Sequence, residues 1–493
     1  MARCTHAPLL TTLGRIVLLI SFTTAMLGQG QDTTITTGDI TAAEKLVGLY
    51  FTDAKRDSML EGLVEQLANH RKLREIPLSN SVPPSLLFNP SPHGFRFETT
   101  RRPFVTGSTG EVKLPSRLED VAFYSIGQLA ELIRTRRVTS QQLTAMYLTR
   151  LKKYGPGLEC VVTLTKDLAI KQAHRADDEI AQGKYRGPLH GIPYGAKDLL
   201  ATRGIRTTWG SVPFKDQVID EDATVIKKLE EAGAILVAKL TMGELAWGDV
   251  WFGGMTRNPW NLKQGSSGSS AGSAAATSAG LVGFAIGTET WGSIVSPSTR
   301  CGVTGLRPTY GRVSRTGAMA LSWSMDKIGP ICRTAEDCAI VFNAIYGPDG
   351  VDQTVYDVPF NYDSIVDLKS LRIGYLKTDF DSVKADAGNN GDALNVLRRL
   401  GATLIPIRLP ALPIGDLSII LSAEAAAAFD ELTRSGKDDL LVRQIKNAWP
   451  NAFRVSRFIP AVEYIQANRV RTLVIEEMAR LMDTIDVYAA PTF

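Results

Sequence analysis

From about Glu119 onward, helix signals alternate with short apolar segments, and no other feature of this 493-residue sequence constrains its fold more. Ser125 and Thr139 each fit a capping box at a helix start, and Thr334 is placed to cap a third helix. The strand signals are the apolar segments AILVAKL, LRIGYL, ATLIPI and DVYAAP. This alternation predicts an α/β fold with a mixed, mostly parallel central β-sheet covered by helices on both faces.

A helical extension is predicted ahead of this body. Between Gln31 and about His70 the pattern is helical, and Thr41 with Glu44 fits a capping box. Prolines then interrupt residues 77–115 too often for a long helix. We therefore expect residues 31–118 to form a helical N-terminal extension and a Pro-rich arm packed on the main domain, 119–493.

The first 30 residues have the pattern of a secretory signal peptide. Arg3 and Arg15 precede the apolar run IVLLISFTTAML, and small residues follow from Gly28. This run is too short to span a bilayer comfortably, although an uncleaved anchor is the alternative. We expect cleavage near Gly30, export to the periplasm or medium, and no stable membrane anchor.

Charge and cysteine content exclude some functions. Lys and Arg total 55 against 51 Asp and Glu, so nothing indicates a nucleic-acid partner. No CxxC pair or His/Cys cluster suggests a metal site. The cysteines beyond the predicted signal form disulfides or stay as buried free thiols, and we favour free thiols; they are Cys160, Cys301, Cys332 and Cys338.

The segment GSSGSSAGSAAATSAG, Gly265 to Gly280, has the composition of a flexible linker. It also contains G-x-S-x-G around Ser270, the pattern of a nucleophile elbow, but that elbow needs a later histidine, and all histidines precede the segment. A phosphate loop would need GxxxxGK[ST], which is absent. A linker or a helix cap stays open on composition alone.

Two further segments change this interpretation: LHGIPYGAKDLLATRGIRTTWGS before the Gly/Ser segment, and GFAIGTETWGSIVSPSTRCGVTGLRPTYGRVSR after it. With all three in this order, the chain resembles the amidase signature family, hydrolases of carboxylic amides that use a Lys–Ser–Ser triad. The motifs of that family read roughly GIPxxxKD, GGSSGGSAAA and GTDTGGSIRxPA. The resemblance runs from about Tyr124 to the last residue.

The resemblance implies a catalytic role for Lys197, Ser269 and Ser293. A serine needs a base to attack an amide, and a lysine kept neutral by burial can serve where no histidine is placed to do so. By resemblance, Lys197 takes a proton from Ser269, Ser269 takes one from Ser293, and Ser293 attacks the carbonyl. No cofactor and no metal are implied.

Further roles follow from the same resemblance. In the family the bridging serine follows a cis peptide bond, and the resemblance implies such a bond between Gly268 and Ser269. Successive backbone N–H groups would form the oxyanion hole, at Thr290, Trp291, Gly292 and the nucleophile itself. Supporting roles fall to Gly268, Ser270 and Glu289.

The sequence departs from the family pattern at four positions: Ala271 and Trp291 replace glycines, Glu289 replaces aspartate, and Val295 replaces arginine. The loss of the arginine predicts the loss of an ion pair, and Trp291 is expected to narrow the acyl pocket. Core packing is the equal alternative for Trp291, as it is for Trp209, Trp247 and Trp251.

The resemblance implies hydrolysis of a small-molecule or peptide amide through an acyl-enzyme, releasing ammonia or an amine. One alternative is the amide-hydrolysing subunit of a tRNA-dependent amidotransferase, which works with partner subunits in the cytoplasm. Another is an inactive amidase-like binding or scaffold protein. The family domain usually continues past a segment like DVYAAPTF, so we expect the domain to be C-terminally incomplete here.

Overall fold

The computed structural model of the chain describes residues 34–382 and 387–492. It divides into two compact units, one ending at Pro77 and the other beginning at Leu78, so the division falls inside the predicted extension. The predicted signal peptide lies outside the described residues. Within them, no helix is long and apolar enough to cross a membrane.

The described part of the smaller unit consists of two helices, α1 (Thr37–Val47) and α2 (Asp53–Arg74). The predicted capping box at Thr41 is wrong, because the helix begins earlier and Thr36 caps it with Asp39. Thr41 instead donates to a carbonyl inside the helix. Glu44 is buried and forms an ion pair with Arg56 at 2.8 Å.

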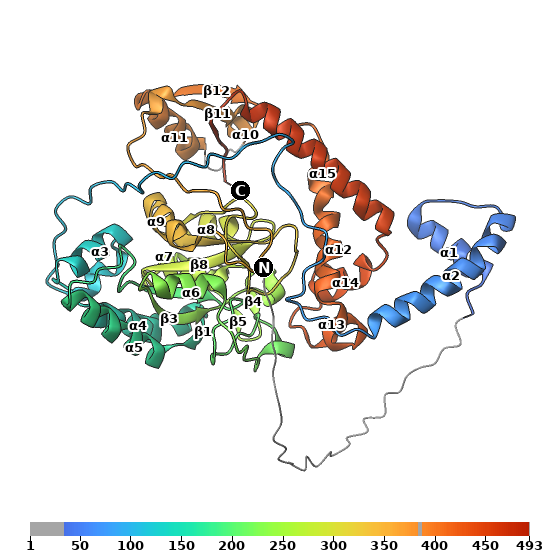
Figure 1. Ribbon diagram of the computed structural model, residues 1–493, viewed down its shortest axis with the longest axis horizontal. Coiled ribbons are helices and arrows are strands. Elements are labelled where there is room, and N and C mark those ends of the chain that lie inside the picture. The colour runs from blue at the N-terminus through green and yellow to red at the C-terminus, as the bar shows by residue number, and fades with distance from the viewer. Residues whose placement is uncertain (1–33, 383–386, 493) are drawn as a thin grey trace, which may run out of the picture. The chain divides into compact units, whose positions relative to one another are not determined.

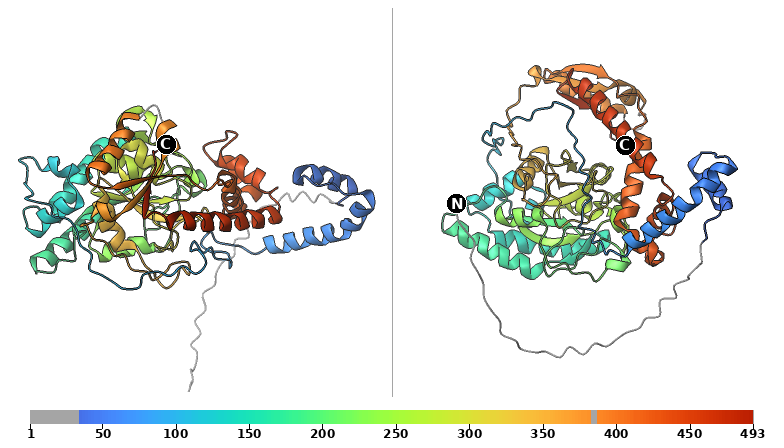
Figure 2. Two further views of the ribbon diagram at one scale, coloured as in Figure 1. Left: turned by 90° about the horizontal axis from the view of Figure 1, so that it is seen from above. Right: turned by 45° about the vertical axis from the view of Figure 1, so that its right-hand side comes forward.

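The larger unit contains a six-stranded sheet in the order β1-β3-β2-β8-β10-β9. Figures 1 and 2 show this unit from three directions. The strands of the sheet are β1 (Val161–Leu164), β2 (Pro193–Lys197), β3 (Ile235–Leu240), β8 (Phe284–Glu289), β9 (Thr304–Gly305) and β10 (Lys327–Cys332). The mixed α/β sheet is confirmed. Only the central strands β3, β2 and β8 pair in parallel, and the outer pairings are antiparallel. The apolar pattern of a buried strand does not encode its direction, which is why the parallel share was overestimated.

Helices pack around this sheet (Figure 1): α3 (Ile126–Arg134), α4 (Ser140–Leu158), α5 (Lys166–Ala181), α6 (Thr224–Glu231), α7 (Ala271–Ser278), α8 (Val295–Cys301) and α9 (Ala335–Ile345). The predicted capping boxes at Ser125 and Thr139 are present, with Gln128 and Gln142 as their partners. Thr334 caps α9 as expected. Local signals therefore located these helix starts correctly.

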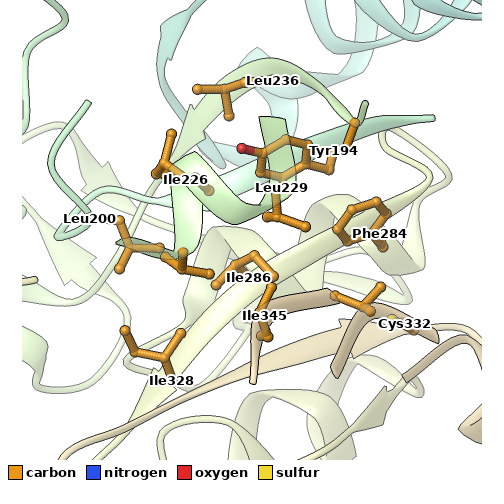
Figure 3. Packing of buried hydrophobic residues seen from close by; sticks show 14 of the residues in the cluster. Tyr194, Leu200, Ile226, Leu229, Leu236, Phe284, Ile286, Ile328, Cys332 and Ile345 are labelled. Carbon is orange, nitrogen blue, oxygen red and sulfur yellow. The ribbon is translucent and has the colours of Figure 1, made fainter. Parts of the chain in front are cut away.

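Alternate residues of β8 lie in two different hydrophobic clusters. Phe284 and Ile286 belong to one cluster, in which Phe284 stacks on Tyr194 with ring centroids 5.2 Å apart (Figure 3). Ala285 belongs to the other, together with Ala275 of α7. Because successive side chains of a strand point to opposite faces, both faces of the sheet are covered. This confirms the predicted helix-covered sheet.

The later strand signals form a separate three-stranded parallel sheet, in the order β12-β11-β13. Its strands are β11 (Arg372–Leu376), β12 (Thr403–Ile407) and β13 (Val487–Ala489). The other helices of this region are α10 (Lys377–Ser382), α11 (Ala387–Arg399), α12 (Ser418–Ala428), α13 (Asp430–Arg434), α14 (Trp449–Ser456) and α15 (Ala461–Met482). Two short hairpins, β4 (Val250–Trp251) with β5 (Gly254–Met255) and β6 (Arg257–Asn258) with β7 (Asn261–Gly265), precede the Gly/Ser segment.

The four described cysteines are free and buried, as we favoured.

Candidate active site

Lys197 is the last residue of β2, and its side chain is completely buried. Its Nζ lies 2.8 Å from Ser269 Oγ, 2.8 Å from Thr288 Oγ1 and 3.1 Å from Ser270 Oγ. Burial lowers the pKa of Lys197 to about 7, against the raising effect of the Asp326 and Glu289 carboxylates. Lys197 therefore holds a substantial fraction of neutral amine near neutral pH, and its nearest side-chain neighbours are hydroxyl groups.

The Gly/Ser segment enters α7 and is not a linker. Ser269 and Ser270 are fully buried, and the peptide bond between Gly268 and Ser269 is cis, as the resemblance implied. A Cβ on Gly268 would lie 1.8 Å from Gly248 O, so no other residue fits there without movement of the backbone. This close packing fixes the position of the serine that contacts Lys197.

Ser270 supports the network around Lys197. Its hydroxyl accepts from Thr288 N at 3.1 Å and donates to Thr288 O at 3.0 Å, while making no capping bond to α7. Ser273, one turn later, donates to Ile286 O at 3.0 Å. These hydrogen bonds join the start of α7 to β8.

Glu289, fully buried at the end of β8, holds the loop that carries Ser293. Its Oε2 accepts from the N–H groups of Ile294 and Val295 at 2.9 and 3.0 Å. Its Oε1 accepts from Arg307 Nη1 at 3.0 Å. Val295 offers no charge, as expected, but the loop still has an ion pair, because Arg307 from the later part of the quoted segment supplies a guanidinium to Glu289.

Successive N–H groups lie unused in this loop. Within the described residues, the backbone N–H groups of Thr290, Trp291, Gly292 and Ser293 donate no hydrogen bond. Gly292 has a φ of +119°, a conformation that favours glycine. Such a run of N–H donors is the kind of group that stabilises an oxyanion.

The structure brings the three sequence-predicted side chains into one region, but with different contacts. Ser269 contacts Lys197 directly. Ser293 is partly exposed, and its carbonyl accepts from Ser270 N at 3.1 Å, which ties its loop to the start of α7. Among the hydrogen bonds of the described chain, none joins the Ser293 and Ser269 hydroxyls.

A cavity of about 630 Å³ opens beside this network, and Thr288 and Thr290 line it. Within the described residues, Trp323 is the one tryptophan in its lining. Trp209 packs on Phe214 in the core, and Trp291 is 48% exposed. Trp291 does not line this cavity, and its expected effect on the acyl pocket stays a prediction.

The sequence analysis missed several residues that complete the site. Thr288 contacts Lys197 twice, through its side chain and its carbonyl. Asp326 accepts from Thr290 Oγ1 at 2.5 Å and from two backbone N–H groups. Asp198, buried next to Lys197, forms a buried ion pair with Lys239 at 3.2 Å. The adjacent Lys-Asp in the first motif was the one available signal for this pair.

No group of three or more His, Cys, Asp or Glu side chains within residues 34–382 and 387–492 is arranged to hold a metal ion.

The helix-covered sheet, the buried lysine and the two serine-bearing loops define this molecule as an α/β enzyme that hydrolyses amides. The chain belongs to the Amidase family, whose model matches residues 142–493.

Relatives and solved structures agree with this assignment. A glutamyl-tRNA(Gln) amidotransferase subunit from Methylococcus capsulatus is 36% identical over 397 residues, which cover 75% of this chain and 82% of that protein. The structure of a peptide amidase from Stenotrophomonas maltophilia matches with a TM-score of 0.64 at 30% identity, covering 71% of this chain and 79% of that one. A bacterial aryl acylamidase matches with a TM-score of 0.67 at 25% identity, covering 76% and 80%.

Proposed function

We propose that this enzyme cleaves linear amides with Ser293 as the nucleophile, Ser269 as the proton bridge and Lys197 as the base. The observation that carries the proposal is the completely buried Lys197 amine, 2.8 Å from Ser269 Oγ and with a pKa lowered to about 7. An amine of this pKa accepts a proton near neutral pH, which an ordinary lysine does not.

The hydrogen bonds around Lys197 fit a neutral amine that accepts from Ser269. The Ser270 hydroxyl already donates to Thr288 O, so its oxygen is available to Lys197 as an acceptor. A neutral amine has two N–H groups and one lone pair. The N–H groups can donate to Ser270 Oγ and Thr288 Oγ1, which leaves the lone pair for the hydroxyl proton of Ser269.

In the proposed reaction, Ser293 Oγ attacks the carbonyl carbon while its proton passes to Ser269 Oγ, and the Ser269 proton passes to Lys197 Nζ. The charge that forms on the carbonyl oxygen is stabilised by the unused N–H groups beginning at Thr290. The relay runs in reverse to protonate the leaving nitrogen, and water then hydrolyses the acyl-enzyme by the same route. The lack of a hydrogen bond between the Ser293 and Ser269 hydroxyls among the described residues is compatible with this relay, since catalytic hydrogen bonds often tighten only when substrate binds.

The substrate is proposed to be a small-molecule or peptide amide, in line with the peptide amidase among the structural neighbours. The N-terminal pattern of residues 1–30 supports an exported enzyme. A second candidate is the amide-hydrolysing subunit of a tRNA-dependent amidotransferase, which the curated relatives favour. Copurification with partner subunits from cytosol would support this second candidate over an exported amidase.

Single and combined alanine variants of Ser293, Ser269 and Lys197 test the assignment. Each is expected to lower kcat by about 10⁴-fold or more, and the triple variant by little more than Ser293→Ala alone, because residues that act as a unit are non-additive. A fluorophosphonate should label wild-type protein at Ser293. Near-normal turnover by folded Ser293→Ala protein contradicts the proposal.

A further inference from the structure

One wall of the cavity comes from the Pro-rich arm. Six arm residues line it, between positions 80 and 87: Asn80, Ser81, Pro83, Pro84, Ser85 and Leu87. The family model begins at residue 142, so this wall lies outside the part of the chain that the family shares. The arm therefore contributes to the cavity something that the family motifs do not describe.

Specific contacts hold the arm in place. The Asn80 side chain donates to Ala320 O at 2.9 Å and accepts from Ala320 N at 2.7 Å. At the other end of the wall, Phe88 packs edge-on against Tyr310 with ring centroids 5.3 Å apart. The Arg471 guanidinium lies 3.4 Å from the Phe88 ring centroid. The wall is thus anchored on both sides.

The cavity is lined by neighbours of the reacting groups, although Lys197, Ser269 and Ser293 are not among its lining residues. Thr288, which lines it, contacts Lys197 Nζ through its hydroxyl and carbonyl oxygens. Thr290, which also lines it, begins the loop that carries Ser293. Through these two threonines the cavity adjoins both the Lys197 network and the loop that carries Ser293, which makes it the candidate space for an acyl group on Ser293.

Apolar side chains make up much of the lining: Leu87, Leu199, Ala318, Met319, Leu321, Trp323, Ile328 and Val351 are among them. Arg315 does not offer a free charge, because it forms an ion pair with Asp352 at 3.2 Å. Lys327 donates to the backbone carbonyls of Thr290 and Met325. In the described lining, Glu221 is the charged side chain without a partner, and it would repel a carboxylate.

We propose that arm residues 80–87 form the specificity-determining wall of the acyl pocket, which accepts neutral, predominantly apolar acyl groups larger than acetyl. The volume of about 630 Å³ lies within the range of small-molecule sites. The inference rests on the proposed role of Ser293. It adds that an element outside the shared family region selects the acyl half of the substrate.

Leu87 and Leu86 offer a matched test. Leu87 lines the cavity and is 46% exposed, whereas its neighbour Leu86 is 86% exposed and lies outside the lining. The two variants Leu87→Trp and Leu86→Trp add the same bulk at adjacent positions of the arm. The assay measures kcat/KM for the p-nitroanilides of acetic, butanoic, hexanoic and phenylacetic acids.

We expect Leu87→Trp to lower the hexanoyl-to-acetyl ratio of kcat/KM by about tenfold or more, the size of effect that a few methylene contacts produce. Leu86→Trp should leave that ratio unchanged, and Leu87→Ala should raise it. Equal hexanoyl-to-acetyl ratios of kcat/KM in the wild type and both Leu87 variants would refute the proposal that the arm selects the acyl group. Fluorophosphonate labelling distinguishes failure of the proposed function from failure of the proposed role of the arm. If the wild-type protein is not labelled at Ser293, the proposed function is wrong. If it is labelled but the ratios do not change, only the proposed role of the arm is wrong.

Discussion

The hydroxyl of Thr288 should tune the pH at which the enzyme becomes active. Its Oγ1 lies 2.8 Å from Lys197 Nζ, and valine has nearly the same shape without the hydroxyl. An ammonium gains more from a hydroxyl acceptor than a neutral amine does, so Thr288→Val disfavours the charged form. The pKa of Lys197 should then fall below its wild-type value of about 7.

The size of this effect follows from the hydrogen bond that is lost. A bond to a charged group contributes about 1.5–3 kcal/mol and a bond between neutral groups about 0.5–1.5 kcal/mol, a difference of about 1 kcal/mol. Because one pKa unit corresponds to about 1.36 kcal/mol, the shift should be about 0.7 unit downward. The active form carries neutral Lys197, so activity is lost as the pH falls through this pKa. The variant should therefore keep its activity to lower pH.

The measurement is kcat/KM for a neutral anilide across about pH 5 to 9, which reports the ionisations of the free enzyme. Thr288→Ser keeps a hydroxyl and should restore the wild-type midpoint, and Ser273→Ala should not move it, because that hydroxyl bonds Ile286 instead. An acid limb that stays in place or moves upward in Thr288→Val would refute the assignment of the limb to Lys197. An acid limb with its midpoint near pH 8 that does not move in the Thr288 variants would indicate that Lys327 titrates instead, because burial lowers the pKa of Lys327 to about 8.

Three further predictions concern two residues that position the site loops and the cleavage of the predicted signal peptide. Gly268→Ala places a Cβ 1.8 Å from Gly248 O, so it should destabilise the fold by about 3 kcal/mol, read from the urea midpoint; an unchanged midpoint would contradict the packing. Glu289→Gln loses the charge that three donors share, and should lower both stability, by about 2 kcal/mol, and kcat, measured by thermal unfolding and turnover. Expression of the full reading frame in a bacterial host should give a periplasmic protein whose intact mass corresponds to cleavage near Gly30; full-length protein confined to the cytosol would refute export.

Much of the site could be predicted because its parts follow each other in quoted motifs. The resemblance of the three motifs to the family implied Lys197 and Ser269, and the structure places their side chains in contact. Glu289 was predicted as a supporting residue on the same basis, and it does hold the following loop. These residues lie within short sequence motifs, and a short motif indicates the local backbone geometry.

The rest depended on contacts between distant segments. Arg307 pairs with Glu289 from 18 positions further along the chain, and no local pattern marks a surface arginine as the partner of a buried acid. Asn80 meets Ala320 across 240 positions of sequence, so the part of the arm in the cavity wall could not be inferred from the prolines that identified the arm. The prediction of a mostly parallel sheet was wrong for a similar reason, because the direction in which two strands pair depends on connections through the whole fold.

The position of the arm also has a consequence for how the molecule assembles. The arm leaves the ribosome before the residues that it binds, because it precedes them in the sequence. Asn80 binds Ala320, and Phe88 contacts Arg471. Such contacts between remote parts of a chain form slowly, because a long loop must close before they are gained. We therefore expect the arm to dock late although it is synthesised early. The cavity lacks this wall until the arm docks, so we expect the acquisition of selectivity to lag behind the acquisition of secondary structure.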